Sequence, residues 1–260
     1  MHRYGTLLHS LVKARSVRNQ SHGTFFLRNR AEIELLIRLA RRKTDGSTLR
    51  IVVLGCSNGA EVYSVLWAMR SARPDLKIRT QAIDISSETI EVAKQGCYCD
   101  RACQMLDTQI FERLTGHETR SLFEKAPGDL KIKPWLKEGV TWLVADAKDS
   151  KLVTLMGLQD IVIANRFLCH MESRDAEECL RNVARLVRRG GYLFISGVDV
   201  DVRTKVARDL AWTPVRELLE EIHDGDPSLR RGWPWEYWGL EPLDKRRPDW
   251  IVRYASVFQL

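Results

Sequence analysis

Short apolar runs alternate with stretches of helical spacing along most of this chain. The run at Ile51–Leu54 is rich in β-branched residues and predicts a strand that is buried on both faces. It ends at Gly55, and from Ala60 to Ser71 apolar residues recur at helical spacing. The pattern therefore predicts a strand, a glycine-containing turn and a helix, and the rest of the chain is organised around this unit.

The same alternation continues to residue 197. The helix expected after the second strand has Ser86 as its N-cap and Gly96 as its C-terminal stop. Strands that alternate with helices predict an α/β protein with a mainly parallel sheet. Further strands are expected at residues 78–83, 140–146, 160–166 and 192–197, and further helices at residues 31–43 and 173–189.

Two regions depart from this alternation. Residues 97–139 predict short helices around 107–114 and 118–123 and a strand near 130–132, and we interpret them as an insertion over the sheet edge or the pocket. Residues 199–260 predict a helix over 205–223, broken near Pro214, and a last, antiparallel strand over 250–258. The expected division is a basic helical segment, residues 1–45, and a cofactor-binding domain, residues 46–260.

The C-terminal part is unusually rich in tryptophan. Five of the eight tryptophans lie in residues 211–260. They indicate either packing against the far edge of the sheet or an aromatic platform for a substrate.

The glycine turn and the next strand carry the main chemical signal. Glycines allow the backbone to approach a ligand, and the N-terminus of the following helix offers N–H groups to an anion. The second strand ends at Asp84, and an acid at this place accepts hydrogen bonds from both hydroxyls of a ribose. The spacing G-x-x-x-G from Gly55 to Gly59 is not the dinucleotide fingerprint, and no P-loop follows. S-adenosylmethionine, which has no pyrophosphate, fits this pattern. The alternative is an α/β domain with a tight turn and an ordinary strand-end acid.

The distribution of charge along the chain bears on which partners it binds. Residues 1–50 hold eleven Lys or Arg against three Asp or Glu, a balance of +8, whereas the remaining chain has thirty against thirty-one, a balance of −1. A basic arm steers acidic partners or nucleic acid, although such residues more often form a solvated helix face. We therefore do not expect nucleic acid as the partner.

The sequence does not show the patterns of a membrane span, a signal peptide or a zinc site. No apolar run approaches the ~18 residues of a membrane span. The N-terminus has no signal-peptide core, so a cytoplasmic location is expected. Cys97, Cys99 and Cys103 form the one cysteine cluster, which lacks the paired C-x-x-C spacing of zinc sites, so no metal is expected.

Five short motifs follow one another along the chain: Thr24–Arg28, Gly59–Ser64, Ala82–Asp84, Asp146–Ala147 and Asp160–Arg166. This ordered set resembles the chemotaxis-receptor glutamate methyltransferases, the CheR-type branch of class I S-adenosylmethionine-dependent enzymes. The resemblance implies an α/β, Rossmann-like class I methyltransferase fold. Its sheet would have seven strands, mainly parallel with the last strand antiparallel, and helices on both faces.

The resemblance also implies which residues line the cofactor pocket. Asp84 would take the ribose, and Arg28 would lie near the methionine carboxylate and the transferred methyl group. Glu61 would contact the methionine end of the cofactor, and Asp146 with Ala147 would lie beside the adenine. The full expected cofactor set is Thr24, Arg28, Gly55, Ser57, Gly59, Glu61, Asp84, Ile85, Asp146, Ala147, Asn165 and Arg166.

Departures from the family pattern concern the substrate. The family has Arg followed by Asn where this chain has Asn165 followed by Arg166, and His170 stands where a tyrosine is expected. The N-terminal helical domain that recognises receptors would be reduced to residues 1–20. Methyl transfer is therefore carried over to this chain, and the receptor is not.

Three residues are candidates for the chemistry of the methyl acceptor. In-line methyl transfer from a sulfonium mainly requires alignment and removal of water. A carboxylate acceptor needs no base, and Arg28 or Arg166 would orient it. A hydroxyl acceptor is helped by a base, for which His170 is the candidate, unless that histidine makes only a structural hydrogen bond.

The expected function is O-methylation of a carboxyl or hydroxyl group on a small molecule, glycan or protein, with S-adenosylmethionine as the cofactor. One alternative is a catalytically silent cofactor-binding sensor or scaffold. The other is an RNA methyltransferase, although Asn165-Arg-Phe-Leu replaces the Asn/Asp-Pro-Pro-aromatic motif of base N-methylation. The oligomeric state is not predicted.

Overall fold

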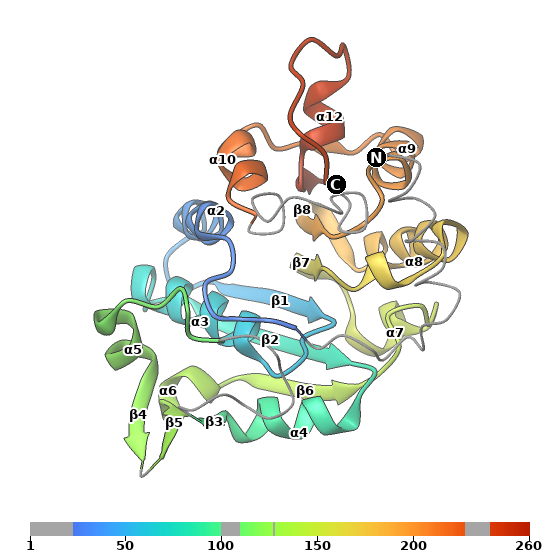
Figure 1. Cartoon of the computed structure of the whole chain (residues 1–260). Helices are drawn as coiled ribbons and strands as arrows, with labels where there is room; N and C mark the ends of the chain where they lie inside the picture. Colours follow the sequence, from blue (N-terminus) through green and yellow to red (C-terminus); the bar gives the residue numbers. More distant parts are fainter. Residues whose placement is uncertain (1–22, 100–109, 127, 227–239) are drawn as a thin grey trace. The chain divides into compact units, whose positions relative to one another are not determined.

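The computed structural model of the chain describes residues 23–99, 110–126, 128–226 and 240–260 (Figure 1). The chain divides into two compact units, of which one comprises residues 21–146 and the other contains residues 147–260.

The first unit is built on three parallel strands in the order β6-β2-β1. β1 spans Thr48–Leu54, β2 spans Lys77–Asp84 and β6 spans Val140–Val144. The last residue of β2, Asp84, pairs with the last residue of β6, Val144, so the carboxyl ends of these strands are level. Because ligands bind outside the carboxyl ends of parallel strands, a ligand site is expected at this edge.

Three longer helices connect and cover these strands, and all three were expected from the sequence. α2 spans Arg30–Arg41, α3 spans Ala60–Ala72 and α4 spans Ser87–Gln95. The Ser86 side chain accepts a hydrogen bond from the backbone N–H of Thr89, and Gly96 ends α4 in the left-handed conformation, so both predicted caps are confirmed. α2 packs beside α3, as Figure 1 shows.

Residues 97–139 contain a small antiparallel sheet of order β3-β5-β4. The strand expected near 130–132 is β5, Asp129–Ile132, and the helix expected near 118–123 is α5, Gly116–Leu122. Residues 110–113 form turns instead of the expected helix, and residues 107–109 lie outside the described residues. The other elements, not foreseen from the sequence, are β3 (Cys97–Cys99), β4 (Phe123–Ala126) and α6 (Pro134–Lys137).

The second unit has four strands in the order β7-β8-β10-β9. β7, Gln159–Asn165, runs parallel to β8, Val187–Ser196. β10, Val257–Gln259, is antiparallel to both β8 and the two-residue β9, Thr213–Pro214. The helices are α7 (Leu152–Met156), α8 (Ser173–Ala184), α9 (Val200–Asp209), α10 (Leu219–Asp224) and α12 (Trp250–Tyr254), with the short 3-10 helix η1 at Leu168–His170.

These strands confirm the fold class predicted from the sequence. The described chain is an α/β protein with a mainly parallel, Rossmann-like sheet. Three strands in the order β6-β2-β1 and four in the order β7-β8-β10-β9 make the expected seven, and the last strand along the chain is antiparallel to its neighbours.

Two helix boundaries predicted in the second unit are wrong. The helix expected over 173–189 ends at Ala184, because β8 begins at Val187, which pairs with Gln159. The helix expected over 205–223 is two helices, and the first begins at Val200 because the Asp199 side chain accepts hydrogen bonds from two backbone N–H groups of its first turn.

The strand expected over 250–258 is also only partly correct. Residues Trp250–Tyr254 form α12, and only Val257–Gln259 are strand. Trp212 packs on Phe258 with 5.6 Å between ring centroids, which supports edge packing for this tryptophan. Trp233, Trp235 and Trp238 lie outside the described residues, as does Cys103 of the cysteine cluster.

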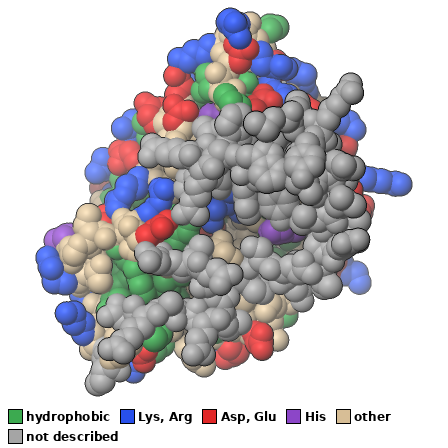
Figure 2. Space-filling model, viewed as in Figure 1, with side chains coloured by type: hydrophobic (Ala, Val, Ile, Leu, Met, Phe, Trp, Pro, Cys, Tyr) green, Lys and Arg blue, Asp and Glu red, His purple; other side chains and the backbone are tan. Residues whose placement is uncertain are grey.

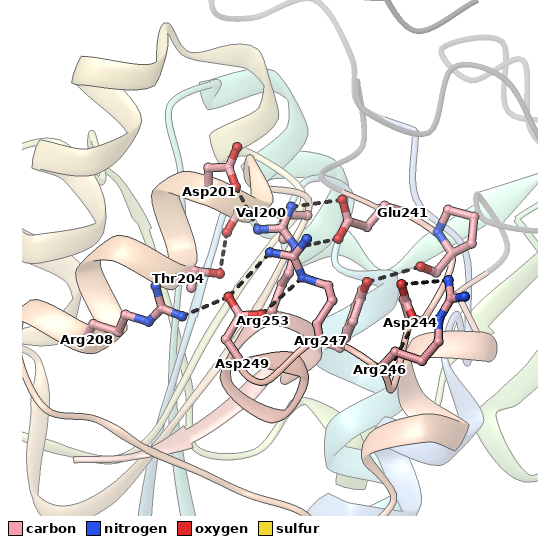
Figure 3. Close-up of polar contacts among 12 residues, drawn as sticks. Val200, Asp201, Thr204, Arg208, Glu241, Asp244, Arg246, Arg247, Asp249 and Arg253 are labelled. Atoms are coloured by element: carbon pink, nitrogen blue, oxygen red, sulfur yellow. Dashed lines mark hydrogen bonds and ion pairs between the residues drawn. The ribbon is translucent and has the colours of Figure 1, made fainter.

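A network of ion pairs holds the chain before α12 against α9 (Figure 3). Arg253 lies between two acids and pairs with Asp201 of α9 and with Glu241. Asp249 pairs with Arg208 of α9 and with Arg247. At the top of the view in Figure 2, basic and acidic side chains are correspondingly interspersed.

In the described part of the chain, no helix combines the length and the apolar character that crossing a membrane requires.

Candidate functional site

Asp84 is the best-defined member of the expected site. Its side chain is buried, at the carboxyl end of β2. One carboxylate oxygen accepts a hydrogen bond from the backbone N–H of Ser57 at 2.8 Å, and the other accepts from the N–H of Ser86 at 3.0 Å. A carboxylate offers about four acceptor positions, so both oxygens keep capacity for the hydroxyls of a ribose.

The turn between β1 and α3 is built on left-handed backbone conformations. Gly55, Ser57 and Gly59 all have positive φ, at 65°, 48° and 86°. A Cβ atom at Gly59 would lie 3.0 Å from the Cβ of Ala93 and 3.2 Å from the Trp142 ring, so only glycine fits without displacement. The close approach that Gly59 allows is therefore to α4 and β6, and the approach of the turn to a ligand stays a prediction.

Two tyrosines fasten the turn and α3 to the rest of the unit. The Tyr98 hydroxyl, from β3, donates to the carbonyl oxygen of Asn58 at 2.7 Å. The Tyr63 hydroxyl donates to the carbonyl oxygen of Ala93 at 2.6 Å, and burial raises its pKa. Neither of these tyrosine contacts was predicted from the sequence.

Burial and the charge of Asp84 raise the pKa of the Cys56 thiol, which is therefore neutral and not a nucleophile.

The segment Thr24–Arg28 is bound to the first turn of α3. The backbone N–H of Leu27 donates to Ser64 Oγ at 3.0 Å, and this hydroxyl donates to the carbonyl oxygen of Ala60 at 2.7 Å. Arg28 follows directly, and its guanidinium carbon lies 4.8 Å from the centroid of the Phe25 ring. The predicted neighbourhood of this segment and the glycine turn is thus present within the unit.

A second arginine, Arg113, lies against the same ring. Its guanidinium carbon is 5.3 Å from the Phe25 centroid, and its Nη1 donates to the carbonyl oxygen of Arg28 at 2.9 Å. Arg30 pairs with Glu118 and holds the pKa of that carboxyl down, to about 2. Arg28 and Arg113 thus lie against the same aromatic ring. Sequence reasoning missed Arg113 because 85 residues separate it from Arg28.

Apolar side chains are exposed beside Asp84. Ile85 is 39% exposed and Val144 is 56% exposed, at the ends of β2 and β6. Exposed apolar residues at this edge suit the face of an adenine ring. Ile85 was among the expected residues, Val144 was not, and Asp146 follows two residues after Val144.

The second unit carries the remaining expected residues at the end of β7. Asn165 Oδ1 accepts a hydrogen bond from Ser196 Oγ of β8 at 2.8 Å. Arg166 follows in the left-handed conformation, with φ 61°, which costs a non-glycine residue roughly 1–2 kcal/mol. Its guanidinium forms an ion pair with Asp226, and both side chains are 8% exposed. Asp226 was not predicted.

His170 and Ala147 also lie in this unit. His170 ends the 3-10 helix η1 and is half-buried, and its backbone N–H donates to the carbonyl oxygen of Phe167. Ala147 is buried. The role of His170 as a base stays a prediction.

Gly197 allows the close approach of Arg166, and its replacement gives a testable result. A Cβ atom at Gly197, which has φ +62°, would lie 2.7 Å from the Cα of Arg166. We expect Gly197→Ala to lower the free energy of unfolding by about 3 kcal/mol, from backbone strain plus this clash. Chemical denaturation measures this.

Gly46→Ala is the control for that measurement. Gly46 has a similar φ of +68° but no atom within 4 Å of the added Cβ, so only the backbone strain of about 1–2 kcal/mol is expected. Equal losses in the two variants would contradict the close approach.

Comparison with known proteins agrees with this geometry. Residues 22–207 match the family described as the CheR methyltransferase, SAM binding domain. The chemotaxis protein methyltransferase Cher2 of Pseudomonas putida is 28% identical over 165 residues, which cover 61% of this chain and 57% of that protein. The probable biofilm formation methyltransferase WspC of Pseudomonas aeruginosa is 25% identical over 212 residues, 80% of this chain and 48% of that protein.

A third relative is an uncharacterised 104.1 kDa protein from the hypE 3′ region of Rhodobacter capsulatus. It is 28% identical over 203 residues, 74% of this chain but 20% of that protein. The chain thus spans about half the length of the two methyltransferases named above, and less of this protein. Because the family match covers residues 22–207, well over half of the chain, the chain belongs to the CheR methyltransferase family through its S-adenosylmethionine-binding domain.

Proposed function

We propose that this chain is an S-adenosylmethionine-dependent methyltransferase that esterifies a carboxylate of a protein acceptor. The observation that carries the proposal is the carboxylate of Asp84, held by two backbone N–H groups at a glycine turn. Family membership and the chemotaxis methyltransferases among its relatives support the protein acceptor.

The proposed cofactor set fits the donors that are present. Asp84 would bind the ribose hydroxyls, and the exposed side chains of Ile85 and Val144 would cover the adenine. Gly55, Ser57 and Gly59 would let the backbone approach the methionine end, with Thr24, Glu61, Asp146 and Ala147 as the further expected contacts. When bound, S-adenosylmethionine supplies a methyl group activated by its sulfonium.

The guanidinium groups of Arg28 and Arg113, which lie against the Phe25 ring, favour a carboxylate as the acceptor. Arg28 would orient one carboxylate oxygen toward the methyl carbon, where the new C–O bond forms as the C–S bond breaks and its electron pair stays on sulfur. The products are a methyl ester and S-adenosylhomocysteine, and no proton is transferred. The chain therefore needs no general base for this reaction, and its residues position the acceptor and exclude water.

The test is the chemical stability of the transferred methyl group. The protein is incubated with methyl-tritiated S-adenosylmethionine and bacterial lysate proteins, and methanol released by mild alkali is counted. Carboxyl methyl esters release methanol under these conditions. Alkali-labile label is expected, with a loss of at least tenfold in Arg28→Ala, because charge-assisted hydrogen bonds contribute about 1.5–3 kcal/mol.

Arg41→Ala is the control, since Arg41 is an exposed arginine at the end of α2. It should retain the wild-type rate. Alkali-stable label on these proteins would contradict the carboxylate acceptor and favour a hydroxyl. No labelled product, with S-adenosylhomocysteine still bound, would favour the sensor or scaffold.

A further inference from the structure

Two leucines at the amino end of β7 are exposed on the second unit. The Leu155 side chain, in α7, is 63% exposed, and that of Leu158, directly before β7, is 52% exposed. Single exposed leucines are common in soluble proteins, but these two share the short turn that joins α7 to β7. Leu152 and Met156 of the same helix are buried, so the core contacts of α7 are already made by other side chains.

Basic side chains lie beside this leucine pair. Lys151 stands one helical turn before Leu155, on the same side of α7, and is exposed. The backbone N–H of the first β7 residue donates to the carbonyl oxygen of Leu186 at 2.8 Å. This hydrogen bond brings the chain at Leu158 next to Arg185, the exposed residue that ends α8.

A bulge in β8 adds two arginines at the same end of the strands. β8 pairs with the first residue of β7 at Val187 and with the third at Tyr192, so residues 188–191 bulge out between these pairings. Arg188 and Arg189 lie in the bulge, and both are exposed. Arg188 pairs with the buried Asp160, whereas Arg189 forms no ion pair within the described part of the chain.

These residues form what we call the basic leucine surface, which consists of Lys151, Leu155, Leu158, Arg185, Arg188 and Arg189. Residues 149–160 and 185–191, which contain it, hold four basic residues against two acids, a balance of +2. One of the two acids, Asp160, is buried and already paired. A partner that complements this surface is therefore both apolar and anionic.

A membrane with anionic phospholipids has both properties. A side chain that lines a peptide-binding groove is largely covered by the groove, whereas both leucines are more than half exposed. Protruding leucines enter the boundary between headgroups and acyl chains, while Lys and Arg beside them contact the lipid phosphates. β8 pairs with β7 on one side and with β10 on the other, so it offers no free edge to an extended peptide.

We propose that the basic leucine surface holds this chain against anionic phospholipid membranes. The surface lies at the amino end of β7, whereas Asn165 lies at the carboxyl end of the same strand. A strand of this length separates its two ends by roughly 20 Å. The contact therefore leaves the carboxyl end of β7 accessible. The inference goes beyond the proposed function and does not depend on the methyl acceptor.

Cosedimentation with lipid vesicles tests the proposal. The protein is mixed with vesicles of phosphatidylcholine alone or of equal parts phosphatidylcholine and phosphatidylglycerol, and the bound fraction is measured at low and high salt. Wild type is expected to bind the mixed vesicles at least about tenfold more tightly, because each basic residue near an anionic surface contributes about fivefold. Salt should reduce this difference by screening the charges.

Two double variants locate the contact. Leu155→Ser with Leu158→Ser is expected to weaken binding to the mixed vesicles about tenfold, since two apolar side chains no longer leave water. Arg185→Gln with Arg189→Gln should weaken it by at least about tenfold through the lost charges. The control is Arg41→Gln with Arg120→Gln, which removes the same charge from two exposed positions of the first unit and should change binding less than about twofold.

Several outcomes would overturn the inference. Equal binding of wild type to both kinds of vesicle would show that no anionic lipid is recognised, and this comparison needs no variant. Unchanged binding in both double variants would assign the lipid contact to other basic residues. If the leucine variant loses self-association in sedimentation velocity but binds vesicles as wild type does, the surface contacts a second copy instead. The affinity for S-adenosylhomocysteine should be the same in wild type and all variants, so failure of this inference leaves the proposed function intact.

Discussion

Asp84→Ala is expected to weaken the binding of S-adenosylhomocysteine at least a hundredfold. The alanine removes the proposed acceptor of two ribose hydroxyl hydrogen bonds. It also leaves the N–H groups of Ser57 and Ser86 without the carboxylate that now binds them. Two charge-assisted hydrogen bonds at about 1.5–3 kcal/mol each exceed the roughly 2.7 kcal/mol that a hundredfold change requires. Calorimetric titration of wild type and variant measures the difference.

Glu88→Ala is the control for this measurement. Glu88 is an exposed acid in the first turn of α4, four residues after Asp84, and its loss changes the net charge equally. We expect its affinity to match wild type. An Asp84→Ala affinity within threefold of wild type would refute the ribose assignment, and the glycine turn would then be only a structural feature.

Phe26→Ala is expected to lower the free energy of unfolding by about 3–5 kcal/mol. Phe26 is completely buried, and its ring meets three others, those of Tyr98, Phe111 and Phe123, with centroids 5.3, 6.0 and 5.0 Å away. Alanine would leave a cavity in this aromatic cluster and remove the favourable edge-to-face contacts. Chemical denaturation gives the change.

Phe26→Leu keeps most of the apolar volume and should cost clearly less, which separates cavity formation from loss of the aromatic contacts. The same two variants are also expected to reduce methyl transfer in the same order, because Phe26 lies two residues before Arg28. A loss below about 1 kcal/mol in Phe26→Ala would show that the cluster repacks around the cavity.

The aromatic cluster also explains how the insertion serves the site. Phe26 comes from the segment before α2, Tyr98 from β3 and Phe123 from β4. Tyr98 reaches from this cluster to the carbonyl oxygen of Asn58 in the glycine turn. Residues 97–99 and 110–126 are therefore part of the scaffold that holds the turn and the segment carrying Arg28.

Local patterns in the sequence predicted β1, α3 and α4 and the place of Asp84. A β-branched run, a glycine turn and helical spacing predict β1 and α3, because burial on both faces and amphipathicity leave a periodic signature. Ser86 and Gly96 bound α4 as expected, since capping depends on the residue type at one position. Asp84 was likewise found from its place after a strand.

Other features depended on contacts between residues far apart in the chain. Val187 begins a strand, although its spacing continues the stripe of α8, because pairing with Gln159 satisfies its backbone. Similarly, residues 250–254 read as a strand by composition but form a helix packed on α9.

Asp226 and Arg113 were not predicted from the sequence for the same reason: their contacts join residues that are far apart in the chain. Asp226 lies 60 residues after Arg166, and Arg113 lies 85 residues after Arg28. Neither carries a local motif, because an ion pair or a shared aromatic ring requires only proximity in space. The fold class could thus be predicted from the sequence, and so could Asp84 as the expected ribose acid. The tertiary structure alone decided which charges stand beside the two candidate arginines, since only folding brings those side chains together.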